Sequence, residues 1–307
     1  MKSIKYYEML DKKSPMIPLS YDFLTKSLFS RNKKFLRLFL NSQLKSSLDI
    51  DFLDENTKIR LASNELAKEN KKEHANKVDI LLYVNKKTII NIEINTEYFK
   101  SIYGRNFIYL LKLTVSTFKS GDTSKNIKEY KIHQLNININ DSDKIYASKD
   151  IELFKEEEYG DLIDELGDYI IHIKNIAYYY DLYYNKHEKL NNSQMWLLLF
   201  SARSYTELYK LASKIMNEKD VSEFMEEMEK LNSDDFILSE WEQKQLDQMV
   251  RDNEIKYAKE DGRNEGIKQG LEQNRIETAR KMLNKGMILD DIVEITGLSK
   301  KQIEKLR

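Results

Sequence analysis

The chain has 307 residues, no cysteine, 50 Lys and Arg residues and 51 Asp and Glu residues. Its length allows one large domain or two smaller ones, and the lack of cysteine excludes disulfide bonds and thiolate metal sites. The N-terminus has no basic-then-apolar leader pattern and no apolar run is long enough to span a bilayer, so we expect a cytoplasmic protein that makes no membrane contact.

Charge is distributed unevenly along the sequence. Residues 1–150 contain 27 Lys and Arg residues and 18 Asp and Glu residues, whereas residues 151–307 contain 23 and 33. The first half therefore carries a net charge of +9 and the second half −10. Such an asymmetry predicts that the N-terminal half binds an anionic partner, with nucleic acid as the first candidate. The alternative is that the two halves attract each other.

Hydrophobic periodicity predicts a mixed α/β region followed by helices. The predicted elements, in chain order, are helical segments over 18–45, a short strand over 57–63, a charged loop over 66–76, a hairpin over 78–95, a long helix over 98–120, strands over 130–139, 149–154 and 168–176, and helices over 178–189, 193–216, 220–231 and 239–285. The order helix, strands, helix, strands is typical of an α/β domain that ends near residue 190.

The hairpin "KVDILLYVNKKTIINIEIN", residues 77–95, carries one acidic residue in each apolar strand, Asp79 and Glu93. A three-residue loop over 85–87 pairs Val84 with Thr88, and counting outward places Asp79 opposite Glu93. Like charges at facing positions destabilise a sheet. A divalent cation offsets that repulsion, because carboxylates are the preferred ligands of hard ions such as magnesium. The hairpin therefore predicts a metal site.

Alternation of side chains across the second strand supports this interpretation. Ile90, Ile92 and Ile94 fall on one face, which suits a hydrophobic core. Asn91, Glu93 and Asn95 fall on the other face, which suits chemistry or water. The competing interpretation is that Glu93 and Asn95 point to solvent from a half-exposed hairpin.

The segment 251–275 is polar on nearly all faces, as in a helix that bridges solvent or pairs with another copy. Gly262, Gly266 and Gly270 recur every four residues and share one stripe. They predict either close approach of two helices in a homodimer or a loosely helical linker.

The final segment, "LDDIVEITGLSKKQIEKLR" (289–307), predicts a helix, a turn and a second helix. Gly297 ends the first helix and Ser299 caps the second. The pattern fits a helix-turn-helix, whose second helix would offer Lys300, Lys301, Gln302, Lys305 and Arg307 to a DNA groove. The sequence alone favours a small packing or dimerisation hairpin over this interpretation.

Four stretches, by their residues and by their order along the chain, resemble the PD-(D/E)XK family transposases, also called recombination-promoting nucleases. The hairpin resembles the catalytic hairpin of that family. "YDFLTKSLF" (21–29) resembles its opening helix, and "GRNFIYLLKLTVSTFKSGD" (104–122) the helix after the hairpin. The segment that begins "EGIKQGLEQNRIETARKM" resembles its glycine-spaced tail and end segment.

The resemblance implies a restriction-endonuclease-like α/β fold with a helical C-terminal extension. It implies DNA cleavage that depends on Mg²⁺ or Mn²⁺, and a role in recombination. By position, Asp79, Glu93 and the carbonyl of Ile94 would be metal ligands, and Asn95 would complete the catalytic set. The position of Asn95 holds Lys in the broad superfamily and usually Gln in this family. We therefore expect slow rather than absent cleavage, which Asn95→Gln would accelerate.

The resemblance also places Lys26, Arg105 and Tyr109 where they would contact DNA, with Arg capable of bidentate phosphate binding. A surface salt bridge is the alternative for Arg105. The four histidines lack metal-ligand spacing and are interpreted as ordinary surface or strand residues.

Three parts are expected: a nuclease-like domain over 1–190, a helical region over 191–285 and a helix-turn-helix-like end segment over 286–307. The favoured function is a metal-dependent endonuclease that acts on double-stranded DNA as a homodimer paired through the C-terminal helix. One alternative is a weakly active or inactive DNA-binding or defence module on the same fold. Another is a helical oligomerisation protein whose N-terminal domain serves as a scaffold.

Overall fold

The computed structural model describes residues 2–61, 80–85, 87–95, 104–105, 108–109, 111–112, 130–139, 151–153 and 168–306. The chain divides into two compact units, Met1–Leu238 and Ser239–Arg307. The first unit contains a sheet with its covering helices, and the described elements of the second unit are all helices.

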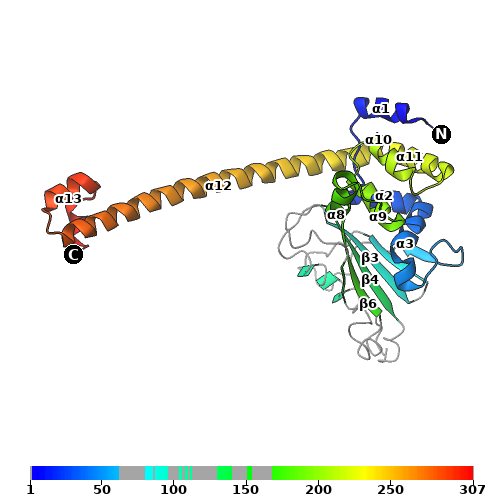
Figure 1. Ribbon diagram of the computed structural model, residues 1–307, viewed down its shortest axis with the longest axis horizontal. Helices are drawn as coiled ribbons and strands as arrows, with labels where there is room; N and C mark the ends of the chain where they lie inside the picture. The colour runs from blue at the N-terminus through cyan, green and yellow to red at the C-terminus, as the bar shows by residue number, and fades with distance from the viewer. Residues whose placement is uncertain are drawn as a thin grey trace. The chain divides into compact units, whose positions relative to one another are not determined.

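The sheet has six strands in the order β1-β2-β3-β4-β6-β5, of which β3, β4 and β6 are labelled in Figure 1. The strands are β1 (Ile59–Leu61), β2 (Ile80–Val84), β3 (Thr88–Asn95), β4 (Lys131–Asn138), β5 (Ile151–Leu153) and β6 (Asp168–Asn175). The central strands β3, β4 and β6 run parallel, whereas β1–β2, β2–β3 and β5–β6 are antiparallel pairs. Each predicted strand is present at its expected place in the chain.

The predicted register of the hairpin is confirmed over its described residues. Val84 pairs with Thr88 and Ile80 pairs with Ile92. Asn85 begins the turn with φ 54°, a left-handed conformation that asparagine tolerates better than most residues. Asp79 lies outside the described residues.

Both faces of the central strand are covered, since all eight residues of β3 are buried. Glu93 and Asn95 are 2% and 5% exposed. The interpretation that these two side chains point to solvent is therefore wrong. Strands buried on both faces are typical of parallel pairing, and β3 pairs in parallel with β4.

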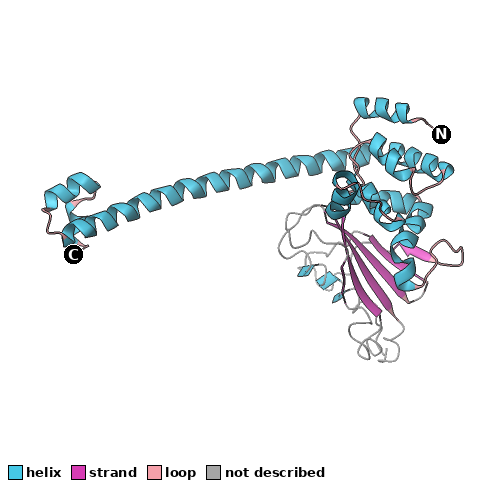
Figure 2. Ribbon diagram, in the orientation of Figure 1, coloured by secondary structure: helices cyan, strands magenta, loops and turns pink. Residues whose placement is uncertain are grey.

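The helices of the first unit are drawn in cyan in Figure 2. They are α1 (Ile4–Lys13), α2 (Asp22–Arg31), α3 (Lys33–Leu48), α8 (Ile176–Tyr180) with the π-helix Asp181–Asn185, α9 (Asn192–Leu198) with the 3-10 turn Leu199–Ser201, α10 (Tyr205–Ala212) and α11 (Glu218–Asn232).

Two predicted helical segments are divided in the structure. The segment 18–45 divides at Asn32, whose side chain accepts a hydrogen bond from the backbone of Lys34 and caps α3. The segment 193–216 divides before α10, where Ser204 accepts a hydrogen bond from the backbone of Glu207 at 3.1 Å. Short polar side chains favour such caps over helix interiors. Within the predicted helix 98–120, the described residues 104–105, 108–109 and 111–112 are helical.

The second unit consists of most of α12 (Asp235–Asn284), together with α13 (Leu289–Thr296) and α14 (Lys300–Glu304). Gly297 ends α13 with φ 68°, and the Ser299 side chain caps α14, as predicted. A buried cluster joins these helices to the end of α12; its members are Ala279, Ile292, Leu298 and Ile303. Within the described part of the chain, no helix combines the length and the apolar character that crossing a membrane requires.

Candidate active site

A buried polar surface extends across the parallel strands of the sheet. On β3 it consists of Asn91, Glu93 and Asn95, which alternate with the isoleucines of the opposite face. The register of β4 places Gln134, Asn136 and Asn138 beside these three residues in turn, and Asn175 of β6 follows Asn138; we call these seven residues the polar face. All seven are at most 8% exposed. So many buried polar side chains are unusual in a core, because each one loses its hydration.

Glu93 is the acidic residue of the polar face. Its Oε1 accepts a hydrogen bond of 3.0 Å from Nδ2 of Asn91, two residues earlier on the same strand. A buried carboxylate is stable in its charged form only when hydrogen bonds or a cation replace the water that it has lost. The Asn91 amide supplies part of that replacement.

Asn95 belongs to a ladder of amides at the carboxyl ends of the three parallel strands. Its Nδ2 donates to Oδ1 of Asn138 at 2.9 Å, and Nδ2 of Asn138 donates to Oδ1 of Asn175 at 3.3 Å. Nη2 of Arg105 donates to Oδ1 of Asn95 at 3.3 Å. The Asn95 side chain is therefore held from both sides, and its orientation is fixed by Asn138 and Arg105 together.

An apolar cluster lies on the same side of the sheet as the polar face and contains Leu81, Ile89, Ile132, Ile171 and Ile173. Tyr109 packs against this cluster, and the Arg105 guanidinium lies 5.6 Å from the centre of the Tyr109 ring. Arg105 thus connects Tyr109, on the apolar part, with Asn95, on the polar part. The segment after the hairpin contributes both side chains to this side of the sheet.

The structure brings together four of the predicted site residues, Glu93, Asn95, Arg105 and Tyr109. Lys26 lies on α2 with intermediate exposure, and its contact with DNA stays a prediction. The proposed ligand role of the Ile94 carbonyl also stays a prediction, as does any role of Asp79, which lies outside the described residues.

Sequence reasoning did not identify Asn138 and Asn175 as part of the site. The signal was present in the alternation of "HQLNINI", in which Gln134, Asn136 and Asn138 share one face of their strand. Their proximity to Glu93 depends on parallel pairing between β3 and β4, and strand order is not encoded in local periodicity.

Oxygen donors on the polar face suit a hard cation such as Mg²⁺. Besides the Glu93 carboxylate, Oδ1 of Asn91 and Oε1 of Gln134 are buried and accept no hydrogen bond from any residue that the structure describes. Among those residues, no group of three or more His, Cys, Asp and Glu side chains is placed to hold a metal. A second carboxylate at Glu93 would come from outside the described residues, and the sequence analysis assigns that role to Asp79.

Two histidines occupy the opposite side of the sheet from Glu93. His133 of β4 and His172 of β6 are fully buried, with Nδ1 of His133 and Nε2 of His172 2.9 Å apart and the rings stacked at 5.2 Å. They are strand residues, as interpreted from the sequence, but their contact with each other was not predicted. Their position on the other face separates them from Glu93.

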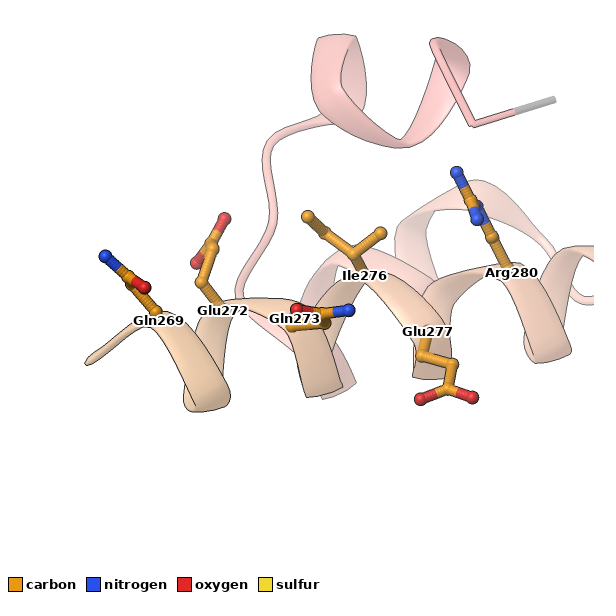
Figure 3. A pocket seen from close by; sticks show the side chains of 6 residues that line it. All are labelled: Gln269, Glu272, Gln273, Ile276, Glu277 and Arg280. Atoms are coloured by element: carbon orange, nitrogen blue, oxygen red, sulfur yellow. The ribbon is translucent and has the colours of Figure 1, made fainter. Parts of the chain in front are cut away.

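A shallow hollow in the second unit lies along the C-terminal part of α12 (Figure 3). The side chains that line it are Gln269, Glu272, Gln273, Ile276, Glu277 and Arg280. Ile276 also packs against the buried cluster of α13 and α14. This surface is open and of mixed charge, unlike the enclosed polar face of the sheet.

A mixed sheet with a parallel centre, a buried polar face that contains Glu93 and a helical extension define an α/β protein. A family model described as PD-(D/E)XK nuclease family transposase matches residues 19–258. That match covers well over half of the chain, and the chain belongs to this family. A second model, described as the C-terminal HTH domain of the Rpn/YhgA-like nuclease family, matches residues 272–307.

The first match confirms the predicted nuclease resemblance. The second supports the helix-turn-helix interpretation of the end segment over the packing hairpin that the sequence alone favoured. No curated protein sequence matches the chain. No solved structure matches it either.

Proposed function

We propose that the protein is a divalent-metal-dependent endonuclease that cleaves double-stranded DNA. The observation that carries this proposal is the buried Glu93 carboxylate on the polar face of a hairpin whose register is the predicted one. A nuclease family provides the chemical context. Continuing the observed register by one residue pair is the basis for assigning Asp79 as the second carboxylate.

Asp79, Glu93 and the Ile94 carbonyl would hold Mg²⁺ or Mn²⁺. When bound, such an ion supplies a more acidic water and stabilises charge on phosphoryl oxygens. The polar face adds enclosure, because its buried side chains lie in a region of low dielectric where electrostatic interactions are stronger. Metal identity is tested by comparing the two ions in the same cleavage assay.

Asn95, Arg105, Tyr109 and Lys26 would hold the DNA backbone at this site. Arg105 donates to Asn95, and the planar guanidinium of an arginine suits bidentate binding of a phosphate. The ladder through Asn138 keeps Asn95, and through it Arg105, in one orientation. A fixed donor is more effective in catalysis than one that must reorganise during the reaction.

The second unit would supply DNA recognition and pairing of two chains. Lys300 and Lys301 of α14 and Lys305 directly after it give the end segment a basic character. A helix-turn-helix places its second helix in the major groove. A homodimer paired through α12 would bring two catalytic sites to one duplex. Such an enzyme would act on cytoplasmic DNA and promote recombination.

The second candidate is a DNA-binding module with weak or no cleavage. The presence of Asn95 where this family usually has Gln favours it, because the shorter amide is engaged by Asn138 and Arg105. Both candidates predict DNA binding that weakens steeply with salt, since phosphate contacts release counterions. Only the first predicts strand breakage.

Conversion of supercoiled plasmid to nicked and linear forms tests the proposal. We expect cleavage by the full chain with Mg²⁺ or Mn²⁺ and none with a chelator. Filter binding on the same DNA measures occupancy independently. Salt-sensitive binding without metal-dependent cleavage would establish the second candidate, and absence of both would reject a DNA-directed function.

A further inference from the structure

The helix α12 exposes a row of large apolar side chains between residues 246 and 271. Leu246, Val250, Tyr257, Ile267 and Leu271 are 53%, 48%, 65%, 51% and 56% exposed. Met249, 61% exposed, borders this row, and Ile255, 52% exposed, lies on the opposite side of the helix. Most of the remaining residues are polar, and some form hydrogen bonds within the helix, such as Gln243 with Asp247 and Gln248 with Asp252. A helix with one uncovered apolar stripe is typical of a helix that pairs with a partner.

The spacing of this row is that of a coiled-coil seam. Alternating steps of four and three residues give one continuous stripe, which we call the seam: Leu246, Val250, Asn253, Tyr257, Glu260, Asn264, Ile267 and Leu271. Seams of this spacing pair with another helix through interlocking side chains. At about 100° per residue, Gly262, Gly266 and Gly270 lie on the opposite side of α12, and nothing lies within 4 Å of a side chain added there.

We propose that the seam binds the seam of a second copy of this chain in antiparallel orientation, centred between Ala258 and Lys259. The inference deepens the homodimer of the proposed function and rests on it. It assigns the contact face and the direction of the partner, neither of which follows from the existence of a dimer.

Self-complementarity of the seam carries this assignment. In the centred antiparallel register, Leu246 faces Leu271 of the second copy and Val250 faces Ile267. Twofold symmetry repeats both contacts, which gives four apolar layers, two at each end. Between them Asn253 faces Asn264, so that amides meet amides. Shifting the register by one heptad instead places Leu246 or Val250 against polar residues.

Parallel pairing is disfavoured at Glu260. In an in-register parallel pair this carboxylate would face its own copy within the seam, and like charges at a buried contact are costly. The antiparallel register places Glu260 beside Tyr257, whose hydroxyl can donate a hydrogen bond to it.

The residues flanking the seam also favour antiparallel pairing at its two ends. Glu240 comes beside Arg275 of the second copy, and Asp247 beside Lys268. Near the centre two like-charged pairs arise, Glu254 with Asp261 and, on the other flank, Lys256 with Arg263. Charge pairs at an exposed rim contribute little each, so the apolar end layers determine the stability of the dimer.

Cysteine cross-linking of the full chain tests the proposal directly, because the chain has no cysteine of its own. Leu246→Cys and Leu271→Cys are mixed and oxidised. We expect disulfides between the two different variants, formed roughly 100-fold faster than by chance encounter because the dimer holds the thiols at high effective concentration. Each variant alone should remain uncross-linked. Ile255→Cys, 52% exposed on the opposite side, is the matched control.

Other cross-linking patterns would overturn the proposal in distinguishable ways. Self-cross-linking of Leu246→Cys alone would show a parallel pair and keep the homodimer. Rapid self-cross-linking of Gly266→Cys would move the contact to the glycine side. A monomer in sedimentation at micromolar concentration would reject both the seam and the homodimer, while cleavage of plasmid would remain testable separately.

Spin labels at position 246 give a second measurement that needs no disulfide geometry. Antiparallel pairing separates the two labels by roughly 40 Å along the helices, from a rise of about 1.5 Å per residue. Parallel pairing separates them by about 10 Å, the distance between packed helices. A short distance, or no coupling between labels, contradicts the antiparallel register.

Discussion

The polar face of the sheet and the seam of α12 depart in opposite directions from the usual arrangement of side chains. At the polar face, a carboxylate and six amides are buried where a core normally places apolar groups. Along the seam, five large apolar side chains are exposed where a surface normally places polar groups. Each departure costs folding free energy. The two proposals account for both departures: a cation and DNA would bind at the first region, and a second chain would bind at the second.

The largest expected effect is at Glu93. Replacing it with Gln preserves its shape and the neighbouring Asn91 but removes the charge that would bind the metal. We expect single-turnover plasmid cleavage to fall about 10³-fold, equivalent to several kcal/mol of transition-state stabilisation. DNA binding at low salt should change little.

Glu8→Gln, at an exposed position on α1, is the matched control and should cleave at the wild-type rate. If Glu93→Gln also cleaves at the wild-type rate, Glu93 is not a metal ligand. The Glu93→Gln protein without metal should unfold at the same temperature as the wild type or a higher one, because a buried charge has been removed.

The amide ladder provides the next largest effect. Asn138→Ala removes the acceptor for Nδ2 of Asn95, and we expect cleavage to fall roughly 10- to 100-fold while metal affinity is retained, the scale of losing one oriented donor. Asn95→Ala combined with Asn138→Ala should be little worse than either alone, because the two residues act as one unit.

Asn175→Ala is the control for this ladder, since it removes only the far end and should cost less. Additive losses in the double variant would show that Asn138 does not act through Asn95. The ladder also changes the expectation for Asn95→Gln. The longer side chain must leave Asn138 or Arg105, so this substitution should now slow cleavage, and acceleration would show that Asn95 acts without its partners.

The buried cluster of the end segment should control DNA affinity. Ile303→Ala empties a fully buried position and should destabilise the packing of α13 and α14 by about 2–4 kcal/mol. We expect weaker plasmid binding by filter assay, with Mg²⁺-dependent cleavage at saturating protein retained. Lys301→Ala leaves the packing intact. It should reduce only the salt dependence of plasmid binding, by about one released counterion. Unchanged affinity in both variants would restrict DNA binding to the first unit.

The smallest effect is on the glycine side of α12. Gly266→Ala meets nothing within 4 Å and should stabilise the helix by about 0.5–1 kcal/mol, because alanine loses less conformational freedom on folding. If the seam is the contact face, the dimer dissociation constant measured by sedimentation should not rise. A weakened dimer would place the partner against the glycines.

Sequence patterns predicted the individual helices and strands better than they predicted which of these elements lie side by side. Strand period and turn chemistry located the hairpin with the register of Val84 and Thr88, and Ser299 and Gly297 marked the end segment. Local periodicity does not encode which strands lie side by side. The contact of Asn95 with Asn138, 43 residues later, therefore escaped prediction. The break at Ser204 was missed because apolar spacing continues across it, while the cap depends on one side chain.

The most direct test of the central claim is binding of Mn²⁺ to the DNA-free protein, measured by electron paramagnetic resonance. The account predicts a bound ion in the wild-type chain that competes with Mg²⁺ and is lost in Glu93→Gln, while Glu8→Gln binds as the wild type does. Equal Mn²⁺ binding by the wild type and Glu93→Gln would contradict a metal site on the polar face of the sheet.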